Sequence, residues 1–389
     1  MKTIKKRKIT AAIFAILVLL VSPPSTFAYP PDNAAVLYYQ ACMLYDVDSE
    51  MNGVLKDLCS GRIEPNEEII EFLQKKRRVI DFVLDASEVR HCDWGVDYSK
   101  GCDALMPPFY KFRQLSYLIV ADARVAAQQG DYKTALGRCT SLYRMARHVN
   151  ERTLISYLVG AALHAVANES VIEILSDMPE DMETLTWLKN QFVLIDKLPF
   201  SVKPALRFEH KAGIISISPD RITHIVQGFG DGALKEKILE RILAADEPFF
   251  DRNREYWSKY MDAVQAAFDL PYPEAYSKLK VLSEKPSKEF SKNPNATLAA
   301  SLASGWHVVC SRSIRSGTDS NALKTAIEIY LIKARTGKLP DALPAGLPGD
   351  LFSGKAFQYE KTTEGFILRC QGKDLSKDEI YQYEFKVKK

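Results

Sequence analysis

Apolar side chains recur every three or four residues through most of the chain, and this spacing most constrains the possible fold. Residues with that period line one face of an α-helix, so each segment needs another element to cover it. The pattern extends over 32–195 and, with interruptions, over 233–335. The sequence therefore predicts a mainly α protein, either a multi-helix bundle or an array of helical hairpins.

Turn-forming residues divide the helical pattern into segments. The first half is expected to hold helices over 32–59, 65–89, 109–129, 131–149, 151–176 and 179–195. Asp32 or Asn33 can cap the first of them. The GDYKTAL stretch at 130–136 resembles the start of a tetratricopeptide hairpin, in which Gly-Asp ends one helix and Ala permits a close crossing. No 34-residue period extends this half-motif, which favours a plain bundle.

The second half is less uniform. Prolines and glycines make 197–232 look irregular, and helices are expected to resume over 233–244, 248–268 and 273–283. The polar stretch 284–297 is interpreted as a linker or mobile loop. A long helix over 295–335 is followed by aromatic and β-branched stretches that predict three short strands, over 357–360, 366–370 and 381–387.

These patterns divide the chain into four parts. They are a signal peptide over 1–28, a helical domain over 29–283, the linker at 284–297 and a small α+β domain over 298–389. In the last part, a three-stranded antiparallel sheet packed on the long helix is the economical arrangement.

The first 28 residues have the layout of a secretory signal peptide. Five cationic side chains in MKTIKKRK precede an almost wholly apolar run over 9–21. Small side chains at Thr26 and Ala28 suit a signal peptidase, so cleavage is expected near Ala28. The apolar run is shorter than the roughly 20 residues that span a bilayer, which argues against an uncleaved anchor. The protein is therefore expected to work outside the cytoplasm, in the periplasm or after secretion.

The charge argues against a nucleic-acid partner, and the hydropathy argues against a stable membrane span. The chain carries 52 Lys and Arg against 49 Asp and Glu, and because five of the cations lie in the signal, the mature net charge is about −2. Without a basic stripe interleaved with aromatic side chains, nucleic acid is not an expected partner. No later apolar run is expected to form a stable membrane span.

Seven cysteines are few for 389 residues, so disulfides are not the main framework, although export permits them. Cys92 and Cys102 flank the turn-rich stretch CDWGVDYSKGC between two predicted helices and are the first candidates for a bridge. Cys42 with Cys59 is a second candidate pair. Neither a Cys-x-x-Cys motif nor a His/Cys cluster at zinc spacing occurs, so neither a metal site nor a cofactor is expected.

The run AIEIYLIKARTGKLPDALPAGLPGDLFSGKAFQY at 326–359 resembles the C-terminal region of the major pseudopilins of type II secretion. Those proteins share a helix carrying Ala and Tyr, a Gly-x-x-Pro turn, a leucine-spaced loop and an aromatic strand. The matching positions are Ala326, Tyr330, Gly337, Pro340, Leu343, Asp350, Gly354, Phe357 and Tyr359. Gly337 suits a positive φ at a helix C-terminus, and Gly354 suits the turn into a strand.

The departures from the pseudopilin pattern are larger than the match. The chain lacks the exposed hydrophobic N-terminal helix and the prepilin-type cleavage site, and Leu351 replaces the usual proline after Asp350. The resemblance implies a calcium site in the C-terminal loops. A single carboxylate, that of Asp350, falls far short of the six to eight oxygens that calcium takes, so no calcium is expected here.

Four other stretches resemble a family of uncharacterised exported proteins of planctomycete-type bacteria. They are NAAVLYYQA at 33–41, the CDWG loop at 92–95, ADARVAAQQGDY at 121–132 and LISYLVGAAL at 154–163. This resemblance implies export and supplies no activity.

No HExxH, GxSxG or GxxxxGK[ST] motif occurs in the chain. A carboxylate and two imidazoles come near one another in sequence at Glu209, His210 and His224, which could serve acid–base chemistry if the segment lines a cleft. His148 and His164 lie in predicted helices and are interpreted as satisfied or surface residues.

The leading functional hypothesis is a non-catalytic helical scaffold that binds an envelope protein or a peptide in grooves between helices. The alternative is an extracytoplasmic hydrolase that acts on an envelope or extracellular polymer, with Glu209, His210 or nearby acidic residues as candidate catalytic groups. A third hypothesis, an accessory component of a secretion or pilus-like machine, rests on the pseudopilin resemblance alone. The sequence leaves the oligomeric state open.

Overall fold

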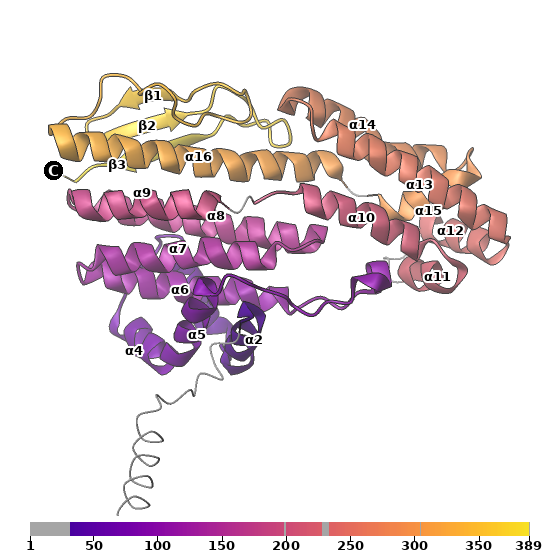
Figure 1. The fold of residues 1–389 in the computed structure, drawn as a ribbon, viewed down its shortest axis with the longest axis horizontal. Helices are drawn as coiled ribbons and strands as arrows, with labels where there is room; N and C mark the ends of the chain where they lie inside the picture. The colour runs from indigo at the N-terminus through magenta and orange to yellow at the C-terminus, as the bar shows by residue number, and fades with distance from the viewer. Residues whose placement is uncertain (1–31, 198–199, 228–232, 304, 389) are drawn as a thin grey trace, which may run out of the picture.

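The computed structural model describes residues 32–197, 200–227, 233–303 and 305–388 (Figure 1). The predicted signal peptide at 1–28 lies outside these residues. Within them the chain forms fifteen α-helices, two 3₁₀ helices and three strands, which confirms the prediction of a mainly α protein with a small C-terminal sheet.

The N-terminal helices are α2 (Ala34–Leu44), α3 (Ser49–Cys59), α4 (Glu67–Lys75), α5 (Arg77–Glu88), η1 (Tyr98–Asp103), α6 (Phe109–Gln128), α7 (Tyr132–Val149), α8 (Leu154–Asp177) and α9 (Met182–Asp196). The later elements are α10 (Lys203–Ser216), α11 (Pro219–Gln227), α12 (Ala233–Leu243), α13 (Glu247–Ala267), α14 (Tyr272–Glu289), η2 (Pro294–Ala296), α15 (Thr297–Leu302), α16 (Trp306–Thr336), β1 (Gln358–Lys361), β2 (Gly365–Arg369) and β3 (Gln382–Lys386).

The elements stack in layers (Figure 1). Helices α2 to α5 cover one side of α6 and α7, and α8 and α9 lie on the other side. Helix α16 packs on α8 and α9, and the sheet lies over α16. Helices α10 to α15 extend the molecule at one end. The segment between α5 and α6 crosses to that end and places η1 against α10.

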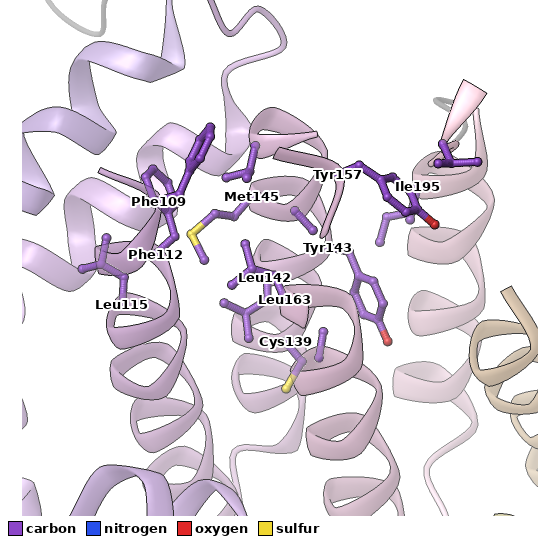
Figure 2. Packing of buried hydrophobic residues seen from close by; sticks show 14 of the residues in the cluster. Phe109, Phe112, Leu115, Cys139, Leu142, Tyr143, Met145, Tyr157, Leu163 and Ile195 are labelled. Carbon is purple, nitrogen blue, oxygen red and sulfur yellow. The ribbon is translucent and has the colours of Figure 1, made fainter. Parts of the chain in front are cut away.

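Side chains from α6 to α9 form the centre of the hydrophobic core (Figure 2). Phe112, Leu142, Tyr143 and Leu163 are each almost fully buried. Burying a side chain of this size contributes about 1.5 to 3 kcal/mol each relative to leaving it exposed. Gly160 lets α8 approach α7 closely, because a Cβ there would lie 2.7 Å from the carbonyl oxygen of Ala146. Close packing of these helices therefore fixes the scaffold on which α5 rests.

Polar side chains set the helix starts, and they explain why two predicted helices divide. The predicted helix 32–59 is two helices, capped by Asn33 and by Asp48, whose side chains accept hydrogen bonds from backbone N–H groups in the first turn. Asn66 caps α4 in the same way, and α4 and α5 meet at Lys76. A capping side chain satisfies a backbone donor that has no partner within the helix.

The stretch 197–232, which the sequence suggests is irregular, contains two helices among the residues described there. Pro204 lies in the first turn of α10, and Pro219 is the first residue of α11. Proline at those positions loses no helical hydrogen bond, because the first N–H groups of a helix have no partner in any case. The prolines therefore begin helices here instead of breaking them.

The expected linker at 284–297 is also largely helical. Helix α14 continues through Pro286 to Glu289, and η2 and α15 follow. Asn253 of α13 joins this connection to the body, because its Nδ2 donates to the carbonyl of Pro294 and its Oδ1 accepts from the backbone N–H of Leu298 at 3.0 Å. Buried residues form one cluster that extends from the N-terminal helices to the sheet.

The prediction of a small C-terminal sheet is confirmed, but the predicted helix over 295–335 is not continuous, because α15 ends at Leu302 and α16 begins at Trp306. The three strands pair antiparallel in the order β1-β2-β3. Tyr330 of α16 packs its ring 5.6 Å from that of Phe366 in β2, and its hydroxyl donates to the carbonyl of Lys386. Gly337 takes φ 73° directly after α16, and Gly354 takes φ 71°, which fits the local reasons given for those two glycines.

One helix of the described residues, α8, is long and apolar enough to cross a bilayer by length and composition, contrary to the expectation that no later run would be. Half of its most apolar stretch is buried within the protein. It contacts α6, α7, α10, α16 and β3, so in this structure it is the central helix of the bundle.

Candidate functional site

The three residues expected to be catalytic are not brought together. Glu209 and His210 are consecutive in α10, and consecutive residues of an α-helix point about 100° apart. His224 lies in the last turn of α11, where its side chain is exposed.

Glu209 caps a neighbouring helix. Its Oε1 accepts a hydrogen bond of 2.8 Å from the backbone N–H of Leu154, the first residue of α8. Burial raises the pKa of Glu209, and this hydrogen bond lowers it. A carboxylate at a helix N-terminus is favoured by the helix dipole. The side chain thus joins α10 to α8.

His210 faces α13 instead. Its Nε2 lies 3.0 Å from Ser258 Oγ, and its Nδ1 lies 3.1 Å from Gln265 Nε2 and 3.7 Å from Asp262 Oδ1. The indole N–H of Trp257 donates to the His210 carbonyl at 3.0 Å. Because both ring nitrogens have partners on α13, His210 serves to pack α10 on that helix.

All seven cysteines are free thiols, so the expected Cys92–Cys102 bridge is not formed, nor is the one between Cys42 and Cys59. The CDWGVDYSKGC stretch is irregular over 92–97 and enters the 3₁₀ helix η1 at Tyr98. Its far end is held at α10, where the backbone N–H of Cys102 donates to Ser216 Oγ at 3.1 Å. Burial raises the pKa of Cys42 to about 11 and also raises that of Cys92, so neither thiol is activated as a nucleophile.

No group of three His, Cys, Asp or Glu side chains suited to a metal ion occurs among the described residues. The pseudopilin-like position Asp350 is fully buried. Its two oxygens accept hydrogen bonds from the backbone N–H groups of Phe352, Gln371 and Gly372 and from the hydroxyl of Ser353, at 2.7 to 2.9 Å. Asp350 therefore joins two loops of the C-terminal element.

A groove runs along α7, between α5 and α9, and we call it the α5–α7 groove. It consists of three adjoining hollows of about 520, 170 and 340 Å³. The first shares Glu88 and Arg144 with the second, and the second shares Arg90, Arg147 and His148 with the third. The hollows thus follow one another along most of α7, from Thr134 in its first turn to His148 in its last.

The walls of the groove differ from one end to the other. The largest hollow is mostly polar and is lined by Thr134, Trp187 and Gln191, among others. The smallest hollow has an apolar wall from α9, made by Leu194 and Ile195. Polar groups placed against apolar walls are typical of a binding site.

The loop before η1 fixes the end of the groove. Trp94 is buried, stacks on Tyr38 with ring centroids 5.6 Å apart, and donates its indole N–H to the carbonyl of His148 at 2.6 Å. The hydroxyl of Tyr38 lies 3.1 Å from Nδ1 of His148. The imidazole is thereby held in one orientation beside Arg147.

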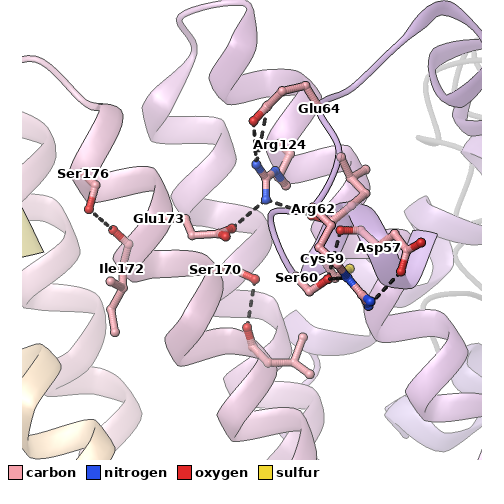
Figure 3. A network of polar contacts seen from close by, with 12 residues as sticks. Asp57, Cys59, Ser60, Arg62, Glu64, Arg124, Ser170, Ile172, Glu173 and Ser176 are labelled. Carbon is pink, nitrogen blue, oxygen red and sulfur yellow. Dashed lines mark hydrogen bonds and ion pairs between the residues drawn. The ribbon is translucent and has the colours of Figure 1, made fainter. Parts of the chain in front are cut away.

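Most half-buried arginines of this protein have carboxylate partners. Arg124, beside a separate hollow, donates to Glu173 and to the carbonyl of Leu58 at 2.8 Å and pairs with Glu64 (Figure 3). Such charge-assisted pairs compensate for the loss of water around the guanidinium.

The same holds for two arginines of the α5–α7 groove. Arg138 donates from Nε to Asp122 at 2.7 Å. Arg144 pairs with Glu88 and donates to Gln191 at 2.8 Å.

Arg147 differs from these arginines. Its Nε is buried without a hydrogen-bond partner, and its guanidinium forms neither a hydrogen bond nor an ion pair with any described residue. Burial lowers the pKa of Arg147 to about 10, and the charge of Asp196 opposes that change. Arg147 nevertheless stays cationic at neutral pH. The exposed Arg90 at the same end is likewise without an ion pair among the residues described.

His148 is neutral at this end of the groove. Burial, followed by the charge of Arg147, lowers the pKa of His148 to about 4. The positive charge there therefore comes from the arginines. One feature of the sequence indicates this cluster of arginines. Arg144 and Arg147 are three residues apart on the predicted helix 131–149, so they share a face of it.

The chain matches no protein-family model, no curated protein and no solved structure.

Proposed function

We propose that this protein is a non-catalytic binding scaffold that works outside the cytoplasm and holds a peptide segment of an envelope protein in the α5–α7 groove. The observation that carries the proposal is the run of three adjoining hollows along α7, with Trp187, Arg138 and Arg144 in the largest hollow and Arg90 and Arg147 at the other end. Extended segments and helices commonly dock in grooves between helices.

The polar residues of the groove support binding over catalysis. Cys92, which lines the third hollow, is disfavoured as a thiolate, because burial raises its pKa. The imidazole of His148 lies beside the hydroxyl of Tyr38, and the backbone carbonyl of His148 accepts a hydrogen bond from the indole N–H of Trp94. Glu209 and His210 each have a structural partner elsewhere. A nucleophile within reach of a free base, which hydrolysis by covalent catalysis needs, is not assembled among these groups.

Export is the second part of the proposal and rests on the cationic and apolar pattern of residues 1–28. N-terminal sequencing of the protein isolated from its host should find a new start near Tyr29. Recovery of the natural product with its first residue intact in the cytosol would contradict this part.

Selection from a random-sequence peptide display library tests the groove. We expect peptides that bind the purified protein and lose about tenfold or more in affinity for Thr134→Tyr, because the added ring fills the largest hollow. Lys133→Tyr is the matched control, since Lys133 is the preceding residue and half-exposed, and does not line the groove. Equal binding to both variants, or no enriched peptide, would refute the proposal once thermal unfolding shows both variants folded.

A further inference from the structure

The end of the α5–α7 groove, where α5 and α7 both terminate, carries more positive charge than its own side chains neutralise. Arg90 and Arg147 line both of the smaller hollows. The neighbouring Arg144 is already paired with Glu88. The carboxylate whose charge acts on Arg147, that of Asp196, is bound to Lys324 at 2.7 Å. Glu151, which lines the third hollow with Arg90 and Arg147, accepts a hydrogen bond from the hydroxyl of Tyr98. Neither Arg90 nor Arg147 forms an ion pair with a described side chain.

The position of Arg147 in the last turn of α7 accounts for only part of this arrangement. A cation there is favoured by the helix dipole. The dipole, however, supplies no acceptor to the buried Nε–H, and a guanidinium has five donors to satisfy. A buried donor without an acceptor is destabilising. An acceptor brought by a ligand would remove that cost.

The surroundings restrict what such a ligand can be. The hollow beside Arg147 has a volume of about 170 Å³, several times the ~30 Å³ share of one water molecule in the liquid. Leu194 and Ile195 form its apolar wall. An anion carried next to an apolar group fits both features, since the guanidinium fork matches a carboxylate in two-point geometry.

We infer that the peptide bound in the α5–α7 groove presents a carboxylate to Arg147 and Arg90, with an apolar side chain against Leu194 and Ile195. This inference rests on the proposed function, because it names the chemistry of the bound segment. The carboxylate comes either from the C-terminus of the segment or from an acidic side chain, and Arg147 is the residue that recognises it.

Titration with small probes, followed by NMR of the arginine Nε–H signals, tests the inference. N-acetyl-leucine offers a terminal carboxylate beside an apolar side chain, N-acetyl-aspartic acid α-amide offers a side-chain carboxylate, and N-acetyl-leucine amide offers none. We expect a carboxylate probe to saturate at millimolar concentration and to bind about tenfold more tightly than the amide. Tighter binding of the leucine or the aspartate probe identifies the source.

Variants assign the contact. Arg147→Gln should weaken the carboxylate probe by about tenfold, and Arg90→Gln by a smaller factor. Arg335→Gln is the matched control, because Arg335 is exposed in the last turn of α16.

Three outcomes overturn the inference: equal binding of acid and amide, no saturation below about 50 mM, or unchanged binding to Arg147→Gln. If peptides selected on the groove still lose affinity for Thr134→Tyr, the proposed function survives that failure. If they do not, both fail.

Discussion

The indole N–H of Trp94 donates a hydrogen bond of 2.6 Å to the backbone carbonyl of His148. This contact joins the CDWG loop to the last turn of α7, two segments more than fifty residues apart. It holds the end of the α5–α7 groove together, because the carbonyls of a final helical turn have no partner within the helix.

Trp94→Phe should therefore lower the free energy of unfolding by about 2 kcal/mol, since the change removes that hydrogen bond and part of a buried side chain. Urea unfolding at neutral pH measures the loss. Trp187→Phe is the control, because Trp187 is only half-buried and lines the open groove, and it should cost less than about 1 kcal/mol. Equal losses in the two variants would show that the hydrogen bond contributes nothing.

His164 should make the protein less stable in mild acid. It is buried between Tyr143 and Phe200, and neither ring nitrogen has a hydrogen-bond partner among the described residues. Burial is the main reason that its pKa is lowered to about 3. The expectation that this helical histidine is satisfied or at the surface was wrong.

Because the pKa of His164 is lower in the folded protein than in the unfolded chain, acid destabilises the fold. The unfolded chain has a histidine pKa of about 6.5 and binds the proton first, so the stability is fully present above that pH and falls as the pH drops towards the folded value. His164→Phe should make the slope between about pH 6 and pH 4 shallower by on the order of 1 kcal/mol per pH unit. Urea unfolding of both proteins at several pH values measures it. Parallel slopes would contradict the prediction.

Two helical glycines should respond in opposite directions to alanine. A Cβ on Gly213 would lie 2.1 Å from Nε1 of Trp257, whereas the nearest atom to a Cβ on Gly137 is 3.9 Å away. Gly213→Ala should destabilise the protein by about 1 to 3 kcal/mol or more through overpacking. Gly137→Ala should stabilise it by about 0.5 to 1 kcal/mol, because alanine loses less entropy in a helix. Thermal unfolding measures both, and a shift of the same sign in the two variants would refute the argument.

Asp350→Asn should destabilise the C-terminal element, although asparagine has nearly the same shape as aspartate. Each oxygen of Asp350 accepts hydrogen bonds from loop donors, so an amide nitrogen would face N–H or O–H groups. We expect a loss of about 3 kcal/mol or more in urea unfolding. Asp378→Asn, at an exposed loop position with φ 62°, should be nearly neutral, because asparagine tolerates that conformation. Near-neutral behaviour of the Asp350 variant would exclude the joining role.

The sequence predicted the fold best where patterns are local. Strand periodicity placed β1, β2 and β3 within a residue or two, and Asn33 caps α2 as expected. Pro204 and Pro219 were misread as breaks because their effect depends on whether they stand before or within a helix. That position is decided by tertiary packing.

The candidate site was not predictable in the same way. Arg90 and Arg147 line the same two hollows although they are almost sixty residues apart in the sequence. Only tertiary packing brings them together. By contrast, the proximity of Glu209 and His210 in sequence suggested a site, although adjacent helical residues point in different directions.

The final strand lies against a helix from the middle of the chain. β3 contacts α8, and Nζ of Lys388 reaches the carbonyl of Asp177 at 3.2 Å. Asp177 and Lys388 are 211 residues apart in the sequence, so this cover of α8 depends on a contact of very long range. The entropy of closing so long a loop is lost before the contact stabilises the fold, which slows folding.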